Sequence, residues 1–401
     1  MGTLRRPGLD AQPMSLLSEH RTLLKPLRGL YLHIPFCSIK CFYCDFTAFS
    51  GQKKTVSRYL SALDKEASFF PDFKPDTLYI GGGTPSELSE EELEAIFKTI
   101  RARFPHADFK EATFEANPES LNAEKIKILK ESGVNRISLG LQTLDARLLK
   151  SIGRRHSPED FLAVFSNVKK TGGFSVSVDL MYGLPDQSLQ DHLQTLKQIL
   201  DFFPEHLSLY GLQVEDWTLF SKREVKVDEN LAREMFERSI EILKEAGFFH
   251  YEISNFARLG SESLHNKIYW RNGEYLGLGC GAASYLNGAR RVNEDRLISY
   301  CVKLESGQIP VSSSEKLEGV ERLGEMAFLG LRMLEGYAPS QESLRVLAHQ
   351  WISLMDRGLI ERRGDVFRLT KEGLFVANQV FMEFVPPFER TQLRALSEVA
   401  S

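Results

Sequence analysis

The chain has few of the features that mark membrane, secreted or nucleic-acid-binding proteins. No apolar run approaches the roughly 18 residues of a membrane-spanning helix, and polar residues after Arg5 and Arg6 argue against a secretory signal. Only five of the 401 residues are cysteine, too few and too unevenly spaced for a disulfide framework. Lysine and arginine (50) nearly balance aspartate and glutamate (54), so the net charge of −4 gives no basic footprint. We therefore expect a cytoplasmic protein whose thiols stay reduced.

Three of the five cysteines lie within eight residues, at Cys37, Cys41 and Cys44. This spacing allows three thiolates from one loop to converge on a single centre. Iron–sulfur clusters are normally held by cysteine thiolates, commonly by four of them. With three ligands, one iron of a four-iron cluster has no protein ligand and stays open to a small molecule. The spacing therefore predicts a reactive cluster rather than an electron carrier.

Two other interpretations of these cysteines remain open. A Cys3His zinc site is possible with His33, although structural zinc ligands usually come as two separated pairs. His33 is also well placed to belong to the strand that precedes the loop. The loop can instead bind no metal at all. Cys280 and Cys301 stand alone in the sequence; Cys280 is expected to be a small buried residue, and Cys301 gives no signal.

Short β-branched and aromatic runs alternate with amphipathic segments from Gly29 onward. Ser89 and Ser157 mark two of the expected helix starts. Six strand–helix units in succession imply parallel strands with right-handed crossovers. The expected strands are Leu30–Ile34, Thr77–Ile80, Ala112–Glu115, Arg136–Leu139, Ser175–Leu180 and Leu207–Leu212.

Unusual polar residues gather where several of these strands end. A doubly wound sheet would concentrate them at one switch point, whereas a barrel distributes them over many strand ends. We therefore predict an α/β fold with a partial (β/α)6 TIM-like barrel. The residues concerned are the cysteine loop, Gly81–Gly83, Glu115, Gln142 and Asp179.

The pattern changes after the barrel. We expect a flexible N-terminal extension over 1–25, the barrel over 26–260, a connecting region over 261–314 and a helical, winged-helix-like domain over 315–401. A hairpin over Leu359–Leu369, turning at Gly364 and Asp365, suggests the wing. The last segment holds 11 Lys and Arg against 13 Asp and Glu, which argues against nucleic acid as a partner.

The CSIKCFYC loop resembles the signature of the radical SAM superfamily. The resemblance implies that S-adenosylmethionine chelates the open iron, and that a reduced cluster cleaves it to a 5′-deoxyadenosyl radical. An electron donor is implied as well. The cofactor would supply the difficult chemistry while the protein binds, orients and excludes water.

Longer strings resemble the oxygen-independent coproporphyrinogen III oxidase group. They are YLHIPFC at 31–37, NRISLGLQTLD at 135–145, GRRHS at 153–157, DLMYGLPDQ at 179–187 and YEISNFA at 251–257.

Within this group, the chain is more similar to the HemW-type heme chaperones than to the oxidase. The oxidase pattern has a further cysteine two positions after the third, whereas Asp45 and Phe46 follow Cys44 here. The resemblance implies a chaperone that transfers heme to an acceptor protein, and we expect no oxidase turnover. Any membrane association would be peripheral and through the acceptor. An oxidase, and radical modification of RNA or protein, remain the alternatives.

The resemblance also implies the residues that contact S-adenosylmethionine. Among them the glycines of GGGTPS, without Cβ atoms, would let the backbone approach the ligand and expose N–H donors. Without the extra cysteine, a second S-adenosylmethionine is in doubt. The implied contacts are Tyr31, Tyr43, Gly82, Gly83, Thr84, Glu115, Gln142, Arg154 and Asp179.

The string HNKIYW at 265–270 matches a motif linked with heme in the HemW-type proteins. His265 and Tyr269 are the candidate heme ligands, because both residue types serve as axial ligands elsewhere. The alternative is structural, with His265 hydrogen-bonded at a domain junction and Tyr269 and Trp270 as ordinary core residues.

Overall fold

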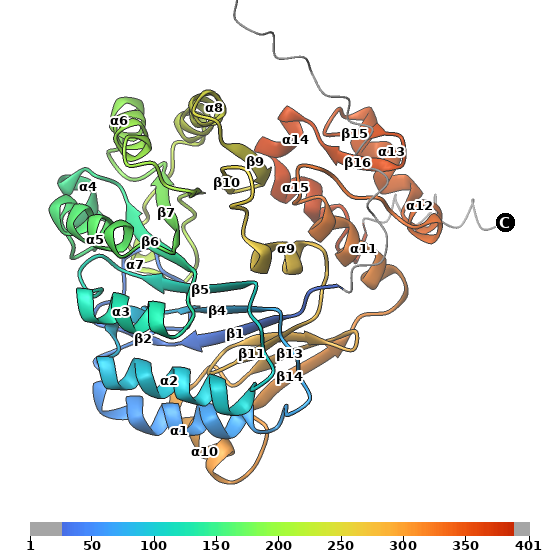
Figure 1. Ribbon diagram of the computed structural model, residues 1–401. Helices are drawn as coiled ribbons and strands as arrows, with labels where there is room; N and C mark the ends of the chain where they lie inside the picture. The colour runs from blue at the N-terminus through green and yellow to red at the C-terminus, as the bar shows by residue number, and fades with distance from the viewer. Residues whose placement is uncertain (1–25, 389–401) are drawn as a thin grey trace, which may run out of the picture.

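The computed structural model describes residues 26–388, so the expected N-terminal extension over 1–25 lies outside the described residues. A curved sheet of twelve strands forms the centre of the molecule (Figure 1). Its middle confirms the predicted partial barrel, because six parallel strands lie side by side in chain order. These strands are β1 (Gly29–Ile34), β4 (Thr77–Gly82), β5 (Glu111–Ala116), β6 (Arg136–Gln142), β7 (Ser175–Tyr182) and β8 (His206–Gly211).

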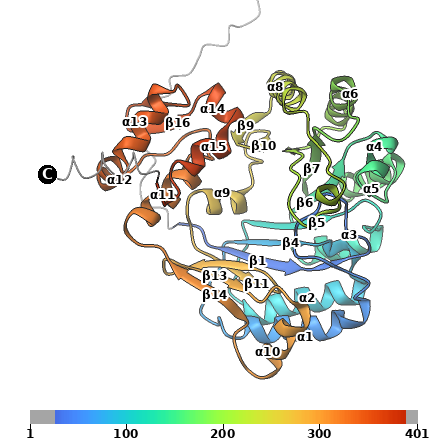
Figure 2. The same ribbon diagram turned by 180° about the vertical axis from the view of Figure 1, so that it is seen from behind.

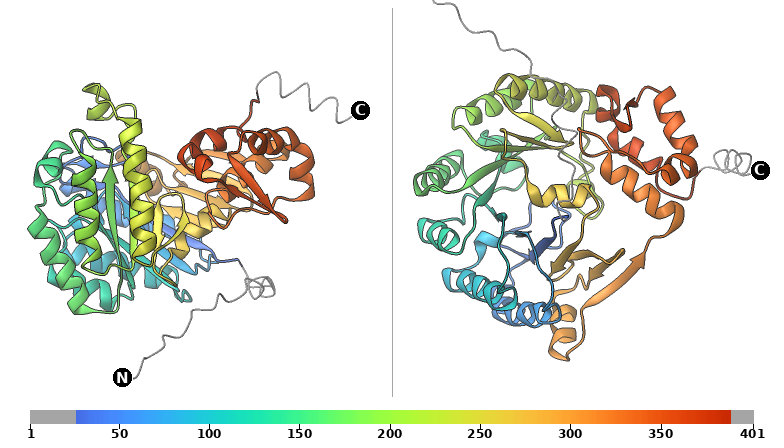
Figure 3. Two further views of the ribbon diagram at one scale, coloured as in Figure 1. Left: turned by 90° about the horizontal axis from the view of Figure 1, so that it is seen from above. Right: turned by 45° about the vertical axis from the view of Figure 1, so that its right-hand side comes forward.

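Successive side chains of a strand point alternately outward and inward, so the barrel has an apolar outer face and a polar lumen. In β1, Leu30 and Leu32 are fully buried in the main hydrophobic core, whereas Tyr31 and His33 alternate with them and form polar contacts with each other. Helices cover the outer face (Figure 3). They are α1 (Val56–Ala67), α2 (Glu90–Arg103), α3 (Ala123–Glu131), α4 (Ala146–Ser151), α5 (Pro158–Thr171), α6 (Leu189–Leu200) and α8 (Glu229–Glu245).

The predicted helix starts are confirmed by their caps. Ser89 caps α2 and Ser157 caps α5, each in a reciprocal capping box with the third residue of its helix. Pro158 occupies the first position of α5, where its missing N–H costs nothing.

The region expected to be a connection, 261–314, instead extends the sheet. Strand β11 pairs in parallel with β1, and three antiparallel strands follow it toward the edge (Figure 2). Strands β9 and β10 extend the opposite edge beyond β8. The added elements are β9 (Phe249–Glu252), β10 (Asn255–Ala257), α9 (Leu264–Trp270), β11 (Tyr275–Leu278), β12 (Ala283–Leu286), β13 (Ala289–Asn293), α10 (Leu297–Glu305) and β14 (Val311–Lys316).

A helical C-terminal unit packs beside the barrel (Figure 1). It has its own apolar cluster around Trp351, and the predicted hairpin is present. The boundaries of the four expected domains stay a prediction. Within residues 26–388, no helix is both long and apolar enough to cross a membrane. The unit consists of α11 (Gly319–Gly330), α12 (Gln341–Val346), α13 (Ala348–Asp356), β15 (Ile360–Arg363), β16 (Val366–Leu369), α14 (Lys371–Phe375) and α15 (Ala377–Met382).

A buried carboxylate on α1 ties the sheet extension to the barrel. Glu66 is 2% exposed and accepts hydrogen bonds from the Tyr300 hydroxyl (2.6 Å), the Gly279 N–H (2.8 Å) and the Asn293 amide (2.6 Å). Burial raises the pKa of Glu66 to about 7, although these three donors oppose the shift.

This raised pKa makes the stability of the fold depend on pH. The unfolded carboxyl ionises near its ordinary pKa while the folded one stays protonated. Stability should therefore fall between about pH 4.5 and 7, by up to about 3 kcal/mol. We expect this fall to be smaller in Glu66→Gln than in the wild type, as measured by urea unfolding at several pH values. Glu94→Gln, on the exposed face of α2, is the control, and a pH-independent difference between wild type and Glu66→Gln would contradict the assignment.

Candidate functional site

The cysteine loop lies at the carboxyl end of β1. The short strands β2 (Phe36–Cys37) and β3 (Phe49–Ser50) pair in parallel and hold its two ends together. All three thiols are half-buried. The sulfur of Cys37 lies 3.4 Å from Oγ1 of Thr84, and Nη1 of Arg154 donates to the sulfur of Cys41 at 3.6 Å. Residues that follow β1, β4 and α4 thus meet at this loop.

The arrangement of the donors disfavours the zinc alternative. In the described part of the chain, no three His, Cys, Asp or Glu side chains are arranged to hold one metal ion. Both ring nitrogens of His33 are also engaged, Nδ1 with the Tyr31 hydroxyl and Nε2 with the Thr47 carbonyl, each at 2.8 Å. A tetrahedral zinc ion would need its four donors within about 4 Å of one another. A four-iron cluster binds each thiolate through a different iron, so its ligands stand farther apart.

The glycine run Gly81–Gly83, at the end of β4, packs against the protein itself. A Cβ on Gly82, whose φ is +116°, would lie 2.6 Å from the His33 ring, and a Cβ on Gly83 would lie 2.8 Å from the Phe36 carbonyl. The Gly82 N–H donates to Glu115 (3.1 Å) and the Gly83 N–H to the Ile34 carbonyl (2.8 Å). The expectation that these N–H groups are free for a ligand is therefore not met. They join the glycine run to neighbouring segments instead.

Asn117 was not predicted, yet it connects the candidate residues. Its amide nitrogen donates to Oγ1 of Thr84 (3.2 Å), and its oxygen accepts from Nη2 of Arg154 (2.7 Å). Because Thr84 and Arg154 each contact a cysteine sulfur, Asn117 fixes both contacts. Its place two residues beyond Glu115, directly after a strand, could have indicated from the sequence that Asn117 belongs to this site.

Gln142 and Arg154 present polar atoms with no partner in the described residues. Gln142 ends β6 at a φ of +72°, is 8% exposed, and leaves its Oε1 unpaired. Nε of Arg154 is likewise buried and unpaired, although Nη2 donates to the Gly140 carbonyl. Buried polar atoms normally have a partner in the protein or in a bound ligand. The rim of the barrel formed by the cysteine loop, Gln142 and Arg154 therefore suits a polar ligand.

Two carboxyl groups lie deeper, in the lumen. Glu115 accepts from the Tyr79 hydroxyl at 2.5 Å, and Asp179 accepts from Ser138 at 3.1 Å. Burial, opposed by the Tyr79 hydrogen bond and aided by the charge of Asp179, raises the pKa of Glu115 to about 7. Burial also raises the pKa of Asp179. Tyr79 was missed, although its place between Leu78 and Ile80 indicates the inner face.

The two predicted tyrosines occupy different places. Tyr43 lies on the cysteine loop between Cys41 and Cys44, and burial raises its pKa. Tyr31 lies two residues before His33 on β1, and its ring lines a separate pocket with Tyr269.

The HNKIYW helix, α9, lies at the opposite end of the barrel from the cysteine loop. Nδ1 of His265 bonds Oγ1 of Thr77, the first residue of β4, at 2.8 Å, and Nε2 bonds the Tyr269 hydroxyl at 2.7 Å. His265 is fully buried, and burial lowers its pKa to about 3. Both ring nitrogens are therefore engaged, as the structural alternative expects. Tyr269 differs, because its ring also faces the pocket.

The chain resembles known proteins in sequence and in fold. Residues 31–199 match the family model of the radical SAM superfamily. The heme chaperone HemW of Bacillus subtilis is 38% identical over 378 residues, which cover 90% of this chain and 99% of the relative. The chain belongs to the HemW family. HemW of Escherichia coli is 40% identical over 265 residues, covering 65% of this chain and 70% of the other.

The solved coproporphyrinogen III oxidase (HemN) of Escherichia coli has the same fold. Its TM-score is 0.78 at 21% identity, over 90% of this chain and 91% of that one. Membership in the radical SAM superfamily implies a [4Fe-4S] cluster and S-adenosylmethionine. The rim fits both, because it combines three soft thiols with the unpaired polar atoms of Gln142 and Arg154.

The cysteine loop generates a direct prediction. Cys41→Ala, purified without oxygen, should lose most of its iron and broad visible absorption, because a thiolate ligand is gone. Iron and sulfide assays measure this. Cys301→Ala, which changes a buried cysteine of α10, should keep the wild-type iron content. A full iron and sulfide complement in Cys41→Ala, or stoichiometric zinc after anaerobic reconstitution, would contradict the cluster.

Proposed function

We propose that this protein is a heme chaperone that carries a [4Fe-4S] cluster and S-adenosylmethionine and transfers heme to an acceptor protein. The match to HemW of Bacillus subtilis carries the proposal, because it covers 99% of that heme chaperone and 90% of this chain. A shared radical SAM barrel alone would not distinguish a chaperone from an enzyme.

Cys37, Cys41 and Cys44 would hold the cluster in this proposal. Gln142 and Arg154 would position S-adenosylmethionine through their unpaired atoms. When bound, the cluster and S-adenosylmethionine together supply reductive cleavage of a carbon–sulfur bond. The other implied contacts, Gly82, Gly83, Thr84, Glu115, Asp179, Tyr31 and Tyr43, stay predictions.

Several of these residues act more clearly on the protein than on a ligand. Thr84 orients Cys37, and Glu115 anchors the Gly82 N–H. Asp179 lies in the lumen among serines of neighbouring strands. We therefore expect substitutions here to disturb the geometry of the rim as well as ligand contacts.

Heme would bind at the other end of the barrel, near α9. Tyr269 is the better candidate ligand in this geometry, since its ring lines a pocket while His265 is enclosed. His265 would then position Tyr269 through their 2.7 Å hydrogen bond. This separation of heme from the cysteine loop favours a carrier over an oxidase, whose substrate would have to reach the radical.

The partners follow from the same proposal. An electron donor would reach the cluster at the cysteine loop, where Ile39 and Phe46 are exposed apolar side chains. The acceptor of heme is a protein of unspecified identity, and any membrane association would be through it. Cytoplasmic location stays a prediction.

Hemin titration tests the heme site. We expect a saturable Soret shift at one hemin per chain, and at least about tenfold weaker binding in the double variant His265→Ala with Tyr269→Ala. Because hemin binds many surfaces, His106→Ala, which removes an exposed histidine, is the control. Unchanged affinity and spectrum in the double variant would make the motif structural, and no saturable binding by the wild type would refute the chaperone.

The oxidase alternative has its own test. With S-adenosylmethionine and a reductant, the cluster-loaded protein should not convert coproporphyrinogen III to protoporphyrinogen IX, because Asp45 and Phe46 follow the third cysteine where the oxidase has another. Chromatographic separation of the porphyrins measures the conversion. The solved HemN oxidase would be the positive control, and product at catalytic ratios would replace the chaperone proposal.

A further inference from the structure

An aromatic pocket lies between α9, the strands β11 to β13 and α11. Its volume is about 360 Å³, within the range of roughly 300–1,000 Å³ typical of small-molecule sites. Flat aromatic walls of this kind suit a planar conjugated ligand. The walls include Tyr31, Tyr269, Trp270, Tyr275, Phe328 and Leu329.

One end of this aromatic pocket carries a compensated charge. Arg290 forms an ion pair with Glu325 and donates to the Tyr275 hydroxyl (3.2 Å) and to Oδ1 of Asn272 (3.1 Å). Because Arg290 already has these partners, it closes the pocket without attracting a further anion.

Arg332 lies beside the aromatic pocket, against the Trp270 ring that lines it, and its guanidinium forms no ion pair within the described residues. It lies two residues beyond the end of α11, the helix that supplies Phe328 and Leu329 to the pocket. Its guanidinium lies 4.2 Å from the Trp270 ring and 5.4 Å from the Phe381 ring. Within the described residues the guanidinium has no hydrogen bond or ion pair, and its Nε is buried.

Two other buried polar atoms near Arg332 also lack partners among residues 26–388. They are Nε1 of Trp270, whose ring Arg332 covers, and Oε2 of Glu252, which attracts Arg332 electrostatically without forming an ion pair. Glu252 is 1% exposed, and its other oxygen accepts from Asn255. Burial lowers the pKa of Arg332, which means that its unpaired charge is costly. A carboxylate at this position would accept from the Arg332 and Trp270 donors that the protein leaves unsatisfied, whereas Oε2 of Glu252, itself an acceptor, would gain no partner from it.

We propose that the aromatic pocket holds the heme, with the porphyrin plane against Trp270 and Phe328 and a propionate carboxylate on Arg332. The inference rests on the proposed function and deepens it, because it assigns the place and the charged contact of the cargo. A guanidinium binds a carboxylate through two parallel hydrogen bonds, which fixes the orientation of the porphyrin.

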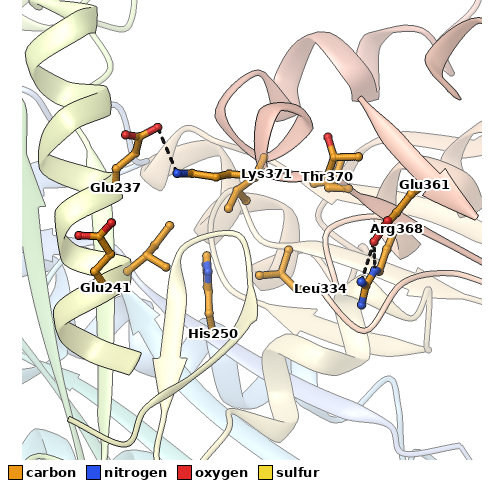
Figure 4. Close-up of a pocket in the computed structure, with 11 residues that line it drawn as sticks. Glu237, Glu241, His250, Leu334, Glu361, Arg368, Thr370 and Lys371 are labelled. Atoms are coloured by element: carbon orange, nitrogen blue, oxygen red, sulfur yellow. Dashed lines mark hydrogen bonds and ion pairs between the residues drawn. The ribbon is translucent and has the colours of Figure 1, made fainter. Parts of the chain in front are cut away.

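A second hollow beside the C-terminal unit does not suit such a ligand. It lies between α8 and the hairpin, and acidic Glu237, Glu241 and Glu361 project into it (Figure 4). Its cations are engaged, since Lys371 pairs with Glu237 (3.9 Å) and Arg368 with Glu361 (2.6 Å). A dianionic porphyrin would meet net negative charge there.

Filling the aromatic pocket tests its occupancy. Leu329→Trp should weaken hemin binding at least about tenfold, because the indole would occupy the space of the porphyrin. Leu193→Trp, a matched change in a hollow on α6, should bind hemin like the wild type. If the wild type binds one hemin and Leu329→Trp binds it equally well, hemin does not occupy this pocket, although the protein is still a heme chaperone. Failure of the wild type to bind would instead refute the proposed function.

The contact of Arg332 with a propionate can be tested separately, and this test does not depend on whether Leu329→Trp folds. The probes are hemin and hemin dimethyl ester, whose propionates carry no charge. The wild type should prefer hemin by about tenfold, and Arg332→Met should lose this preference. Arg322→Met, an exposed arginine on α11, should keep it. Equal preference in Arg332→Met and the wild type would show that Arg332 does not receive the carboxylate.

Discussion

The carboxylate of Glu111 joins the barrel strand β5 to the start of helix α9. It stands at the first position of β5 and accepts the N–H groups of Leu264 and His265, both at 2.9 Å, together with the Ser263 hydroxyl at 3.2 Å. These donors belong to the start of α9, where unpaired N–H groups and the helix dipole favour a negative charge. Arg136 lies 3.9 Å from the same carboxylate and balances it. This contact fixes the start of α9 against the first residue of β5.

The position of α9 gives the barrel two ends with different chemistry. The cysteine loop and its polar contacts lie at the carboxyl ends of the strands, whereas His265 bonds the first residue of β4 at the amino ends. Tyr31 and His33 stand between them on β1, and the His33 ring fills the space beside Gly82. Tyr31, His33 and the glycine run therefore form a continuous line of contacts between the pocket and the end of the barrel that carries the cysteine loop.

The sequence predicted the six barrel strands because the alternation of apolar and polar residues along a strand is a local signal. It predicted the three thiols together because they share one loop. It could not predict that 275–278 pairs with β1, since a parallel register is set by contacts distant in the sequence. The aromatic pocket was invisible for the same reason, because Tyr31, Trp270 and Phe328 come from separate elements. The sequence motif made His265 a candidate heme ligand, but it could not show that both ring nitrogens form hydrogen bonds, one with Thr77 and one with Tyr269.

The pairing of β1 with β11 has a consequence for synthesis on the ribosome. β1 is made first among the described strands, yet one of its two edges is completed only by Tyr275–Leu278. Until more than two hundred further residues have emerged, that edge offers unpaired N–H and carbonyl groups to any passing strand. The nascent chain therefore combines an early strand with a late partner, a topology associated with slow folding and a need for protection from aggregation.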